Sequence, residues 1–197
     1  FIMSKLETNQ VDPATGTTLT LGTSGDTIAI PSGVTIANSG TATGFAGVTE
    51  ADQFRLTADL TGSNADITSN LERVDDASFS KIGTGMTNNS GIFSFPSTGL
   101  YQIINVANAF TPSQDNVYVS TNVTINNSDY DDVARPGLSS SNSYENTATS
   151  VALVNVTDTS NVKVKFTTSS FASNSALQGD TDRNKTHFTF IRLGDSQ

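Results

Sequence analysis

The sequence has no cysteine, no tryptophan and a single histidine, His187. Without cysteine the chain forms no disulfide, so a protein that works outside a cell needs another source of stability, such as oligomerisation. One histidine without cysteine also excludes a transition-metal site of the His-rich or Cys-rich kind. The chain therefore has neither disulfide chemistry nor a transition-metal site of this kind.

Groups arranged for catalysis are also scarce. A Ser-His-Asp arrangement would have to use His187, which lies in an apolar strand pattern, and the sequence has no Gly-x-Ser-x-Gly turn. Paired carboxylates occur at Asp75/Asp76, Asp131/Asp132 and Asp180/Asp182, but in polar segments typical of turns rather than of a desolvated cleft. We therefore expect a protein that is not an enzyme and has no cofactor.

The sequence also has few charged residues and no long apolar run. Charged residues make up 15% of the chain, the net charge is −9 and the isoelectric point is about 4.3. Such a surface repels nucleic-acid phosphates, and the sequence has no basic patch to offset that repulsion. Because no apolar stretch reaches transmembrane length, we expect no membrane insertion.

Thr, Ser and Asn are abundant and account for 72 of the 197 residues. β-Branched Thr suits a pleated surface, and Asn and Ser suit turns. Good helix formers never gather into an amphipathic run. The composition therefore predicts an all-β fold of many short strands.

The stretch from Gly91 to Phe110 is the densest run of large apolar residues. Phe93 and Phe95 alternate with a serine before Pro96, and Gly99 ends a turn that we expect to need a positive φ angle. The following strand, 100–110, is apolar on both faces. A strand of this kind is typical of the centre of a two-layer β structure.

The pattern Phe-x-Phe-Pro-x-x-Gly-x-Tyr over 93–101, with the closing strand 188–194, resembles the jelly-roll domain of complement globular heads and tumour-necrosis-factor ligands. The resemblance implies an antiparallel jelly-roll head over residues 53–197 and threefold assembly. It also implies that five aromatic residues divide between the sandwich core and the threefold axis. These are Phe93, Phe95, Tyr101, Phe188 and Phe190.

Residues 17–52 differ in character from the head. Apolar pairs spaced two residues apart recur at Leu19/Leu21, Ile28/Ile30 and Val34/Ile36, and Gly-rich or Pro-rich turns separate them. Six aliphatic side chains cannot close a core alone, but three copies around an axis could, which predicts a trimeric β spike and neck. The alternative is a flexible Gly/Ser/Thr-rich linker. Residues 1–16 are either an attachment segment or a frayed terminus.

The segment LTLGTSGDTIAIPSGVTIANSGTATGF, residues 19–45, resembles a repeat near the N-terminus of marine bacteriophage fibre and virion structural proteins. This resemblance implies a virion location, with another virion protein holding the N-terminal segment. The function that it implies is a trimeric fibre or spike that contributes to host-surface attachment. Two alternatives remain: a capsid decoration protein, and a secreted ligand of the tumour-necrosis-factor type.

The rest of the head reads as strands near 54–60, 117–125, 151–156, 162–166 and 187–193. Residues 66–76 are ambiguous and could include a short turn of helix. We expect long polar loops over 128–146 and 169–185.

The first of these loops holds the residues that we single out for binding. Flat tyrosine rings flanked by carboxylates suit a host-surface glycan or a receptor, whereas tyrosines that pack the loop onto the sheet are the alternative. The candidate residues are Tyr130, Asp131, Asp132 and Tyr144. Clustered carboxylates at 129–132 and at Asp180 and Asp182 could also hold Ca²⁺, although turn-forming aspartates give the same pattern.

Overall fold

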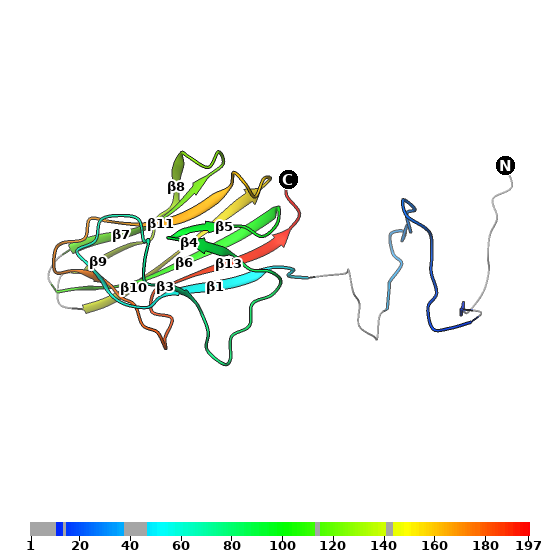
Figure 1. The fold of residues 1–197 in the computed structure, drawn as a ribbon, viewed down its shortest axis with the longest axis horizontal. Coiled ribbons are helices and arrows are strands. Elements are labelled where there is room, and N and C mark those ends of the chain that lie inside the picture. The colour runs from blue at the N-terminus through cyan, green and yellow to red at the C-terminus, as the bar shows by residue number, and fades with distance from the viewer. Residues whose placement is uncertain (1–10, 14, 38–46, 113–114, 141–143) are drawn as a thin grey trace. The chain divides into compact units, whose positions relative to one another are not determined.

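The computed structural model describes residues 11–13, 15–37, 47–112, 115–140 and 144–197. These residues form strands and turns, and no helix occurs among them (Figure 1). None of them forms a helix long and apolar enough to cross a membrane. The chain separates into two compact units, Phe1–Thr43 and Gly44–Gln197. The predicted all-β class is confirmed.

The head, residues 47–197, consists of two antiparallel sheets. Sheet A contains β1 (Ala51–Leu56), β2 (Leu60–Thr61), β3 (Leu71–Arg73), β6 (Gly99–Thr111), β10 (Tyr144–Val156), β12 (Ala176–Leu177) and β13 (His187–Gly194). Sheet B contains β4 (Thr87–Asn89), β5 (Ile92–Ser94), β7 (Asp115–Thr124), β8 (Tyr130–Ala134), β9 (Gly137–Ser140) and β11 (Lys163–Ser169).

Strand β6 is the centre of sheet A, as the long apolar strand predicted. It pairs with β13 and β12 along one edge and with β10 along the other, and the order continues from β13 to β1 and β3. Its burial alternates residue by residue along the full length of the strand. Odd-numbered side chains enter the core, and even-numbered ones stay half exposed, so one chain covers only one face of this strand.

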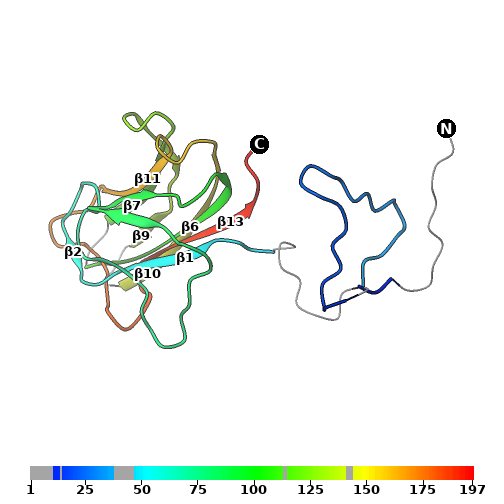
Figure 2. The ribbon, with the colours of Figure 1, turned by 45° about the vertical axis from the view of Figure 1, so that its right-hand side comes forward.

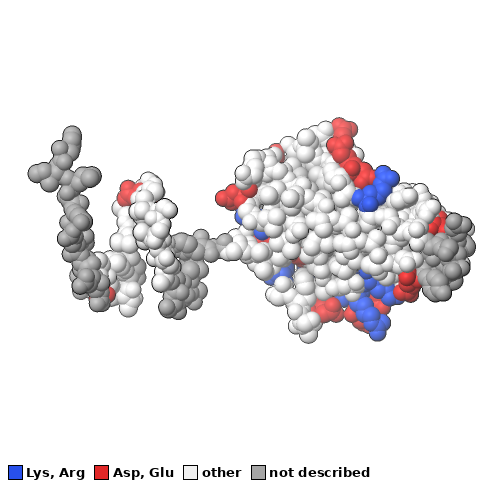
Figure 3. Space-filling model, turned by 180° about the vertical axis from the view of Figure 1, so that it is seen from behind, with Lys and Arg blue, Asp and Glu red and all other residues white. Residues whose placement is uncertain are grey.

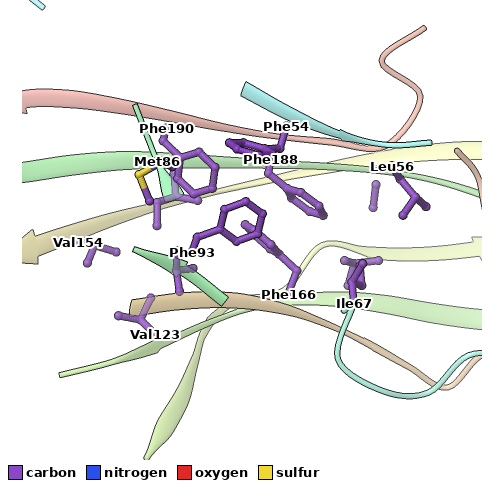
Figure 4. Packing of buried hydrophobic residues seen from close by; sticks show 14 of the residues in the cluster. Phe54, Leu56, Ile67, Met86, Phe93, Val123, Val154, Phe166, Phe188 and Phe190 are labelled. Atoms are coloured by element: carbon purple, nitrogen blue, oxygen red, sulfur yellow. The ribbon is translucent and has the colours of Figure 1, made fainter. Parts of the chain in front are cut away.

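The core lies between the two sheets and is rich in phenylalanine (Figure 4). Phe93 of β5 contacts the rings of Phe54, Phe166 and Phe190 at centroid distances of 5.0, 5.7 and 5.3 Å. These rings come from both sheets, so the aromatic cluster joins the layers. The predicted signature residues Phe93, Phe95, Tyr101, Phe188 and Phe190 are all buried in this one core. None of the five is left on the surface of the chain for contact at an axis.

Three segments differ from what the sequence predicted. Residues 128–146 contain β8, β9 and the start of β10, and residues 169–185 contain β12 and the buried side chains of Phe171 and Leu177. Residues 66–76 contain β3 and no helical turn. Apart from β10, these strands are short and pair through backbone groups with longer neighbours, so they need little apolar alternation of their own.

The chain enters the head at β1, which pairs with the last strand, β13. Ala51 pairs with Ile191, so β1 begins two residues before the predicted start of the head at residue 53, at the end where β13 finishes (Figures 1 and 2). Residue Asp115 lies at the opposite end of the sandwich, because β6 runs the length of the sheet before the chain turns into β7. The head therefore has an entry end and a far end.

The described part of the N-terminal unit, 11–13 and 15–37, forms turns without a strand. Thr23 and Asp26 close one turn, in which the Asp26 amide donates to the Thr23 carbonyl at 3.0 Å. Val34 closes another by donating to the Pro31 carbonyl at 3.2 Å. All six paired aliphatic residues are exposed, so the single chain builds no core from Leu19, Leu21, Ile28, Ile30, Val34 and Ile36. Residues 1–10 of the predicted attachment segment lie outside the described residues.

Candidate functional site

The outer face of sheet A carries an aliphatic surface that the chain leaves uncovered. Even-numbered residues of β6 point outward, and the ladder partners on β10 and β13 extend the same rows. The middle row runs from Val151 through Ile104 to Thr189, and the next row runs from Leu153 through Gln102 to Ile191. We give the name A face to the aliphatic residues of these two rows and of the rows on either side of them: Leu100, Ile104, Val106, Val151, Leu153 and Ile191.

Strand β10 forms the open margin of the A face. Val151 and Leu153 are 51% and 63% exposed although both lie in the middle of a thirteen-residue strand. No strand of the described residues pairs with the second edge of β10. An exposed edge strand with aliphatic outward side chains is a surface that soluble proteins usually cover.

Beyond β13, the outer face of sheet A becomes ionic. The Arg55 side chain of β1 is only 1% exposed and donates hydrogen bonds of 2.7 Å to Glu72, Asp75 and Asp76. Burial lowers the pKa of Arg55, but the bonds and charges of Glu72 and Asp76 outweigh it, so that pKa is raised. Asp75 and Asp76 therefore serve as structural partners of a buried cation.

His187 begins β13 on the same outer face, in register with Val106 and Arg55. Its Nδ1 atom lies 3.0 Å from the Asn184 carbonyl oxygen. Burial lowers the pKa of His187, and backbone hydrogen bonds at Asn184 and Lys185 offset part of that shift. The ring lies in the sheet surface and has no serine nucleophile among its hydrogen-bond partners.

Of the residues predicted to bind, Tyr130, Asp131 and Asp132 lie together on β8. The Tyr130 ring lies beneath Lys165, whose Nζ atom is 4.4 Å from the ring centroid. Asp132 accepts hydrogen bonds of 2.8 Å from Ser120 Oγ and from Arg135 Nε. Tyr130 is thus packed onto sheet B, as the alternative interpretation expected.

Tyr144 does not join the other three. Tyr130 pairs with Thr124 at the end of β7 in sheet B, whereas Tyr144 pairs with Thr111, the last residue of β6 in sheet A, a few residues before β7 begins. The ten residues from Asp115 to Thr124 span about 30 Å of strand at a rise of about 3.3 Å per residue. The four predicted residues therefore do not form one binding site.

The aspartates considered for Ca²⁺ are engaged in turns. Asp129 accepts hydrogen bonds from Asn126 and Ser128, and Asp180 accepts one from the Asp182 amide. Within the described ranges, no group of three or more His, Cys, Asp or Glu residues is placed to hold a metal ion.

Charged side chains are sparse on the face of the molecule in Figure 3, where they form small groups at the margins around a broad uncharged middle. Among the described residues, most basic side chains pair with a nearby acid, as Arg73 does with Asp52 and Lys165 does with Asp66. This pairing leaves no broad basic surface of the kind that nucleic acids require.

No protein-family model matches the chain, and no curated protein is similar to it. Solved structures do match. The structure of Eiger TNF from S. frugiperda aligns with a TM-score of 0.59 at 14% identity and covers 75% of this chain and 94% of that chain. Murine APRIL at pH 5.0 aligns with a TM-score of 0.54 at 12% identity, over 73% of this chain and 98% of that chain. The globular domain of zebrafish complement 1qA protein aligns with a TM-score of 0.47 at 12% identity, over 75% and 99%.

The first two matches confirm the predicted jelly-roll fold of the head. At such low identity the likeness shows the fold alone, and function has to be argued from the surfaces of this chain.

Proposed function

We propose that this protein is a non-enzymatic structural component of a phage virion, a homotrimeric fibre or spike whose jelly-roll head contributes to host-surface attachment. The N-terminal segment, 1–16, attaches the trimer to another virion protein, and residues 17–52 form a spike and neck. The head comprises residues 53–197.

The observation that carries the proposal is the uncovered A face. Three adjacent strands present aliphatic side chains outward, and complete burial of a Val, Leu or Ile side chain contributes about 1.5–3 kcal/mol. A second copy of the chain is the occupant that accounts for this surface, because threefold assembly is typical of the tumour-necrosis-factor-like jelly rolls that the head resembles.

The N-terminal unit supports the same assembly. Its six paired aliphatic residues are all exposed in one chain, and its turns at 23–26 and 31–34 are already formed. Three copies side by side would bury the pairs against one another and would offset the ordering cost of about 1–2 kcal/mol per residue. The resemblance of residues 19–45 to phage virion proteins supplies the location.

Light scattering on the purified chain tests the assembly. We expect a mass three times the 20.6 kDa of one chain. Leu153→Glu, which places a charge in the A face, should yield monomer. Ile125→Glu is the matched control, because Ile125 is 76% exposed in the turn between β7 and β8, away from sheet A. A wild-type monomer, or a Leu153→Glu trimer as stable as the control, contradicts the proposal.

Attachment and capsid decoration both use a trimer, and position on the particle distinguishes them. Cryo-microscopy of virions should place the head at the tail or at a fibre tip, and the isolated head should bind host cells. A head found only on the capsid shell, without binding to cells, would favour the decoration protein.

A further inference from the structure

We infer that the far end of the head carries a saccharide-binding site centred on Tyr118 of β7. Two open hollows meet at this residue. One, of about 490 Å³, is lined by Asp115, Asn116, Tyr118 and Ser170. The other, of about 270 Å³, adds Gly137, Leu138 and Ser139 of β9 to Asn116 and Tyr118.

The Tyr118 ring stands between the two hollows because its ladder neighbours are small. Tyr118 pairs with Gly137 on one side and with Ser169 of β11 on the other. A Cβ atom at Gly137 would lie only 3.0 Å from Cε1 of the ring, so a larger residue there would displace the tyrosine. The guanidinium of Arg135 lies over the ring, 5.5 Å from its centroid.

Polar groups beside the ring are free to bind a ligand. Neither the Tyr118 hydroxyl nor the Asn116 side-chain amide makes a hydrogen bond within the described part of the chain. Asn116 lies two residues before Tyr118 and therefore on the same face of β7. The Ser139 and Ser170 hydroxyls complete a set of donors and acceptors around one aromatic ring.

The wall of the larger hollow is fixed in place before a ligand arrives. Asp115 accepts hydrogen bonds from Ser175 Oγ at 2.5 Å and from the Ala172 amide at 3.0 Å, which hold the segment after β11 against β7. Phe171 in that segment is buried, and Asn64 pairs with its backbone amide and carbonyl groups. A rigid wall of this kind reduces the ordering cost of binding.

This chemistry selects a neutral sugar. The apolar face of a pyranose ring stacks on an aromatic ring, while its hydroxyls match amide and hydroxyl groups. The net charge of −9 and the carboxylate of Asp115 disfavour acidic sugars. An apolar ligand would need an enclosed apolar cavity, which these open hollows do not provide.

The position of the site agrees with attachment. Asp115 and Asn116 begin β7 at the far end of the head, opposite the end where the chain enters β1. The inference adds the class of ligand to the proposed function. It rests on the proposed function only in taking the host surface as the source of the sugar. The sequence pattern selected Tyr130 and Tyr144 instead, because both lie in a polar segment. It could not select Tyr118, because only the sheet register shows that this residue has small neighbours.

Saturation-transfer difference NMR on the full chain tests the site with glucose, galactose, mannose, N-acetylglucosamine and, as an acidic comparator, N-acetylneuraminic acid. We expect signals from the ring protons of at least one neutral sugar and weaker signals from the acidic one. Tyr118→Ala should weaken that binding about tenfold through loss of the stacking surface. Asn116→Ala should weaken it without disturbing the core, since the residue is exposed.

Tyr130→Ala is the matched control, because that tyrosine is half buried beneath Lys165 on the same sheet and should leave sugar binding unchanged. The inference fails if no neutral sugar gives a signal, if the acidic sugar binds best, or if Tyr118→Ala and Asn116→Ala bind like the wild type. The trimer mass is a separate measurement. A trimer without sugar binding overturns this inference alone, and a monomer that binds sugar overturns the assembly alone.

Discussion

The ring of Phe166 lies flat against the ring of Phe188, with centroids 3.6 Å apart and planes inclined by 11°. Phe166 belongs to β11 of sheet B and Phe188 to β13 of sheet A, and both side chains are fully buried. This stacked pair joins the two layers at the centre of the head (Figure 4).

We expect Phe166→Ala and Phe188→Ala each to lower the free energy of unfolding by about 3–5 kcal/mol, because each leaves a cavity in a packed core. The double variant should lose less than the sum of the two, by about 0.5–1.5 kcal/mol, because the second substitution finds the stacking already removed. Denaturant melts of the four proteins measure this coupling, and strictly additive losses would show that the rings do not interact.

Gly99 opens β6 with a φ angle of +154° and no room for a side chain. A Cβ atom there would lie 2.7 Å from the Gly194 carbonyl oxygen and would collide with the Arg192 side chain. Gly99→Val should therefore impair folding, seen as a lower melting temperature and reduced soluble yield. Gly194→Val is the control, since a Cβ atom at Gly194 meets nothing within 4 Å. Equal melting of the two variants would contradict the predicted strain.

Arg55 is a buried cation with three carboxylate partners, and its removal leaves those carboxylates crowded together. We expect Arg55→Met to cost about 3–5 kcal/mol at neutral pH, the range for loss of one member of a buried ion pair. Adding Asp75→Asn and Asp76→Asn to Arg55→Met should recover part of that loss by removing the repulsion. Chemical denaturation of the single and triple variants measures the recovery, and a triple variant less stable than Arg55→Met would refute the repulsion.

His187 makes the stability of the head depend on pH. Burial holds its pKa in the folded chain below the ordinary value of 6.5, so the unfolded chain binds a proton first as the pH falls. The contribution of His187 to stability is therefore complete above about pH 6.5 and is lost as the pH falls through the folded pKa. His187→Gln should flatten the stability profile between about pH 7 and pH 5. The measurement is the free energy of unfolding from urea melts at several pH values. If it falls equally with pH in the wild type and in His187→Gln, another group is responsible for the pH dependence.

Much of the head follows from local sequence pattern. Alternation of side chains along a strand is a property of the backbone, so the sequence predicted strands near 162–166 and 187–193, and its apolar run predicted the strand at 100–110. The five aromatic residues of the two signature segments were predicted to divide between the core and a threefold axis, and all five lie in the core of one chain. The apolar even-numbered residues of β6 also indicated a second buried face, which one chain does not cover.

The binding residues could not be predicted in this way. Tyr130 and Tyr144 are close in sequence, but Tyr130 pairs with the end of β7 in sheet B, whereas Tyr144 pairs with the end of β6 in sheet A. Tyr118 looked like an ordinary strand residue until the register placed Gly137 and Ser169 beside it.

The sequence by itself determined the class of fold, the aromatic residues at the centre of the core and the difference in character between residues 17–52 and the head. The tertiary structure decided which residues share a surface: the A face, the three acids around Arg55 and the hollows around Tyr118. The physical reason is that side-chain alternation depends on the local backbone, whereas sheet register depends on contacts between residues far apart in the chain.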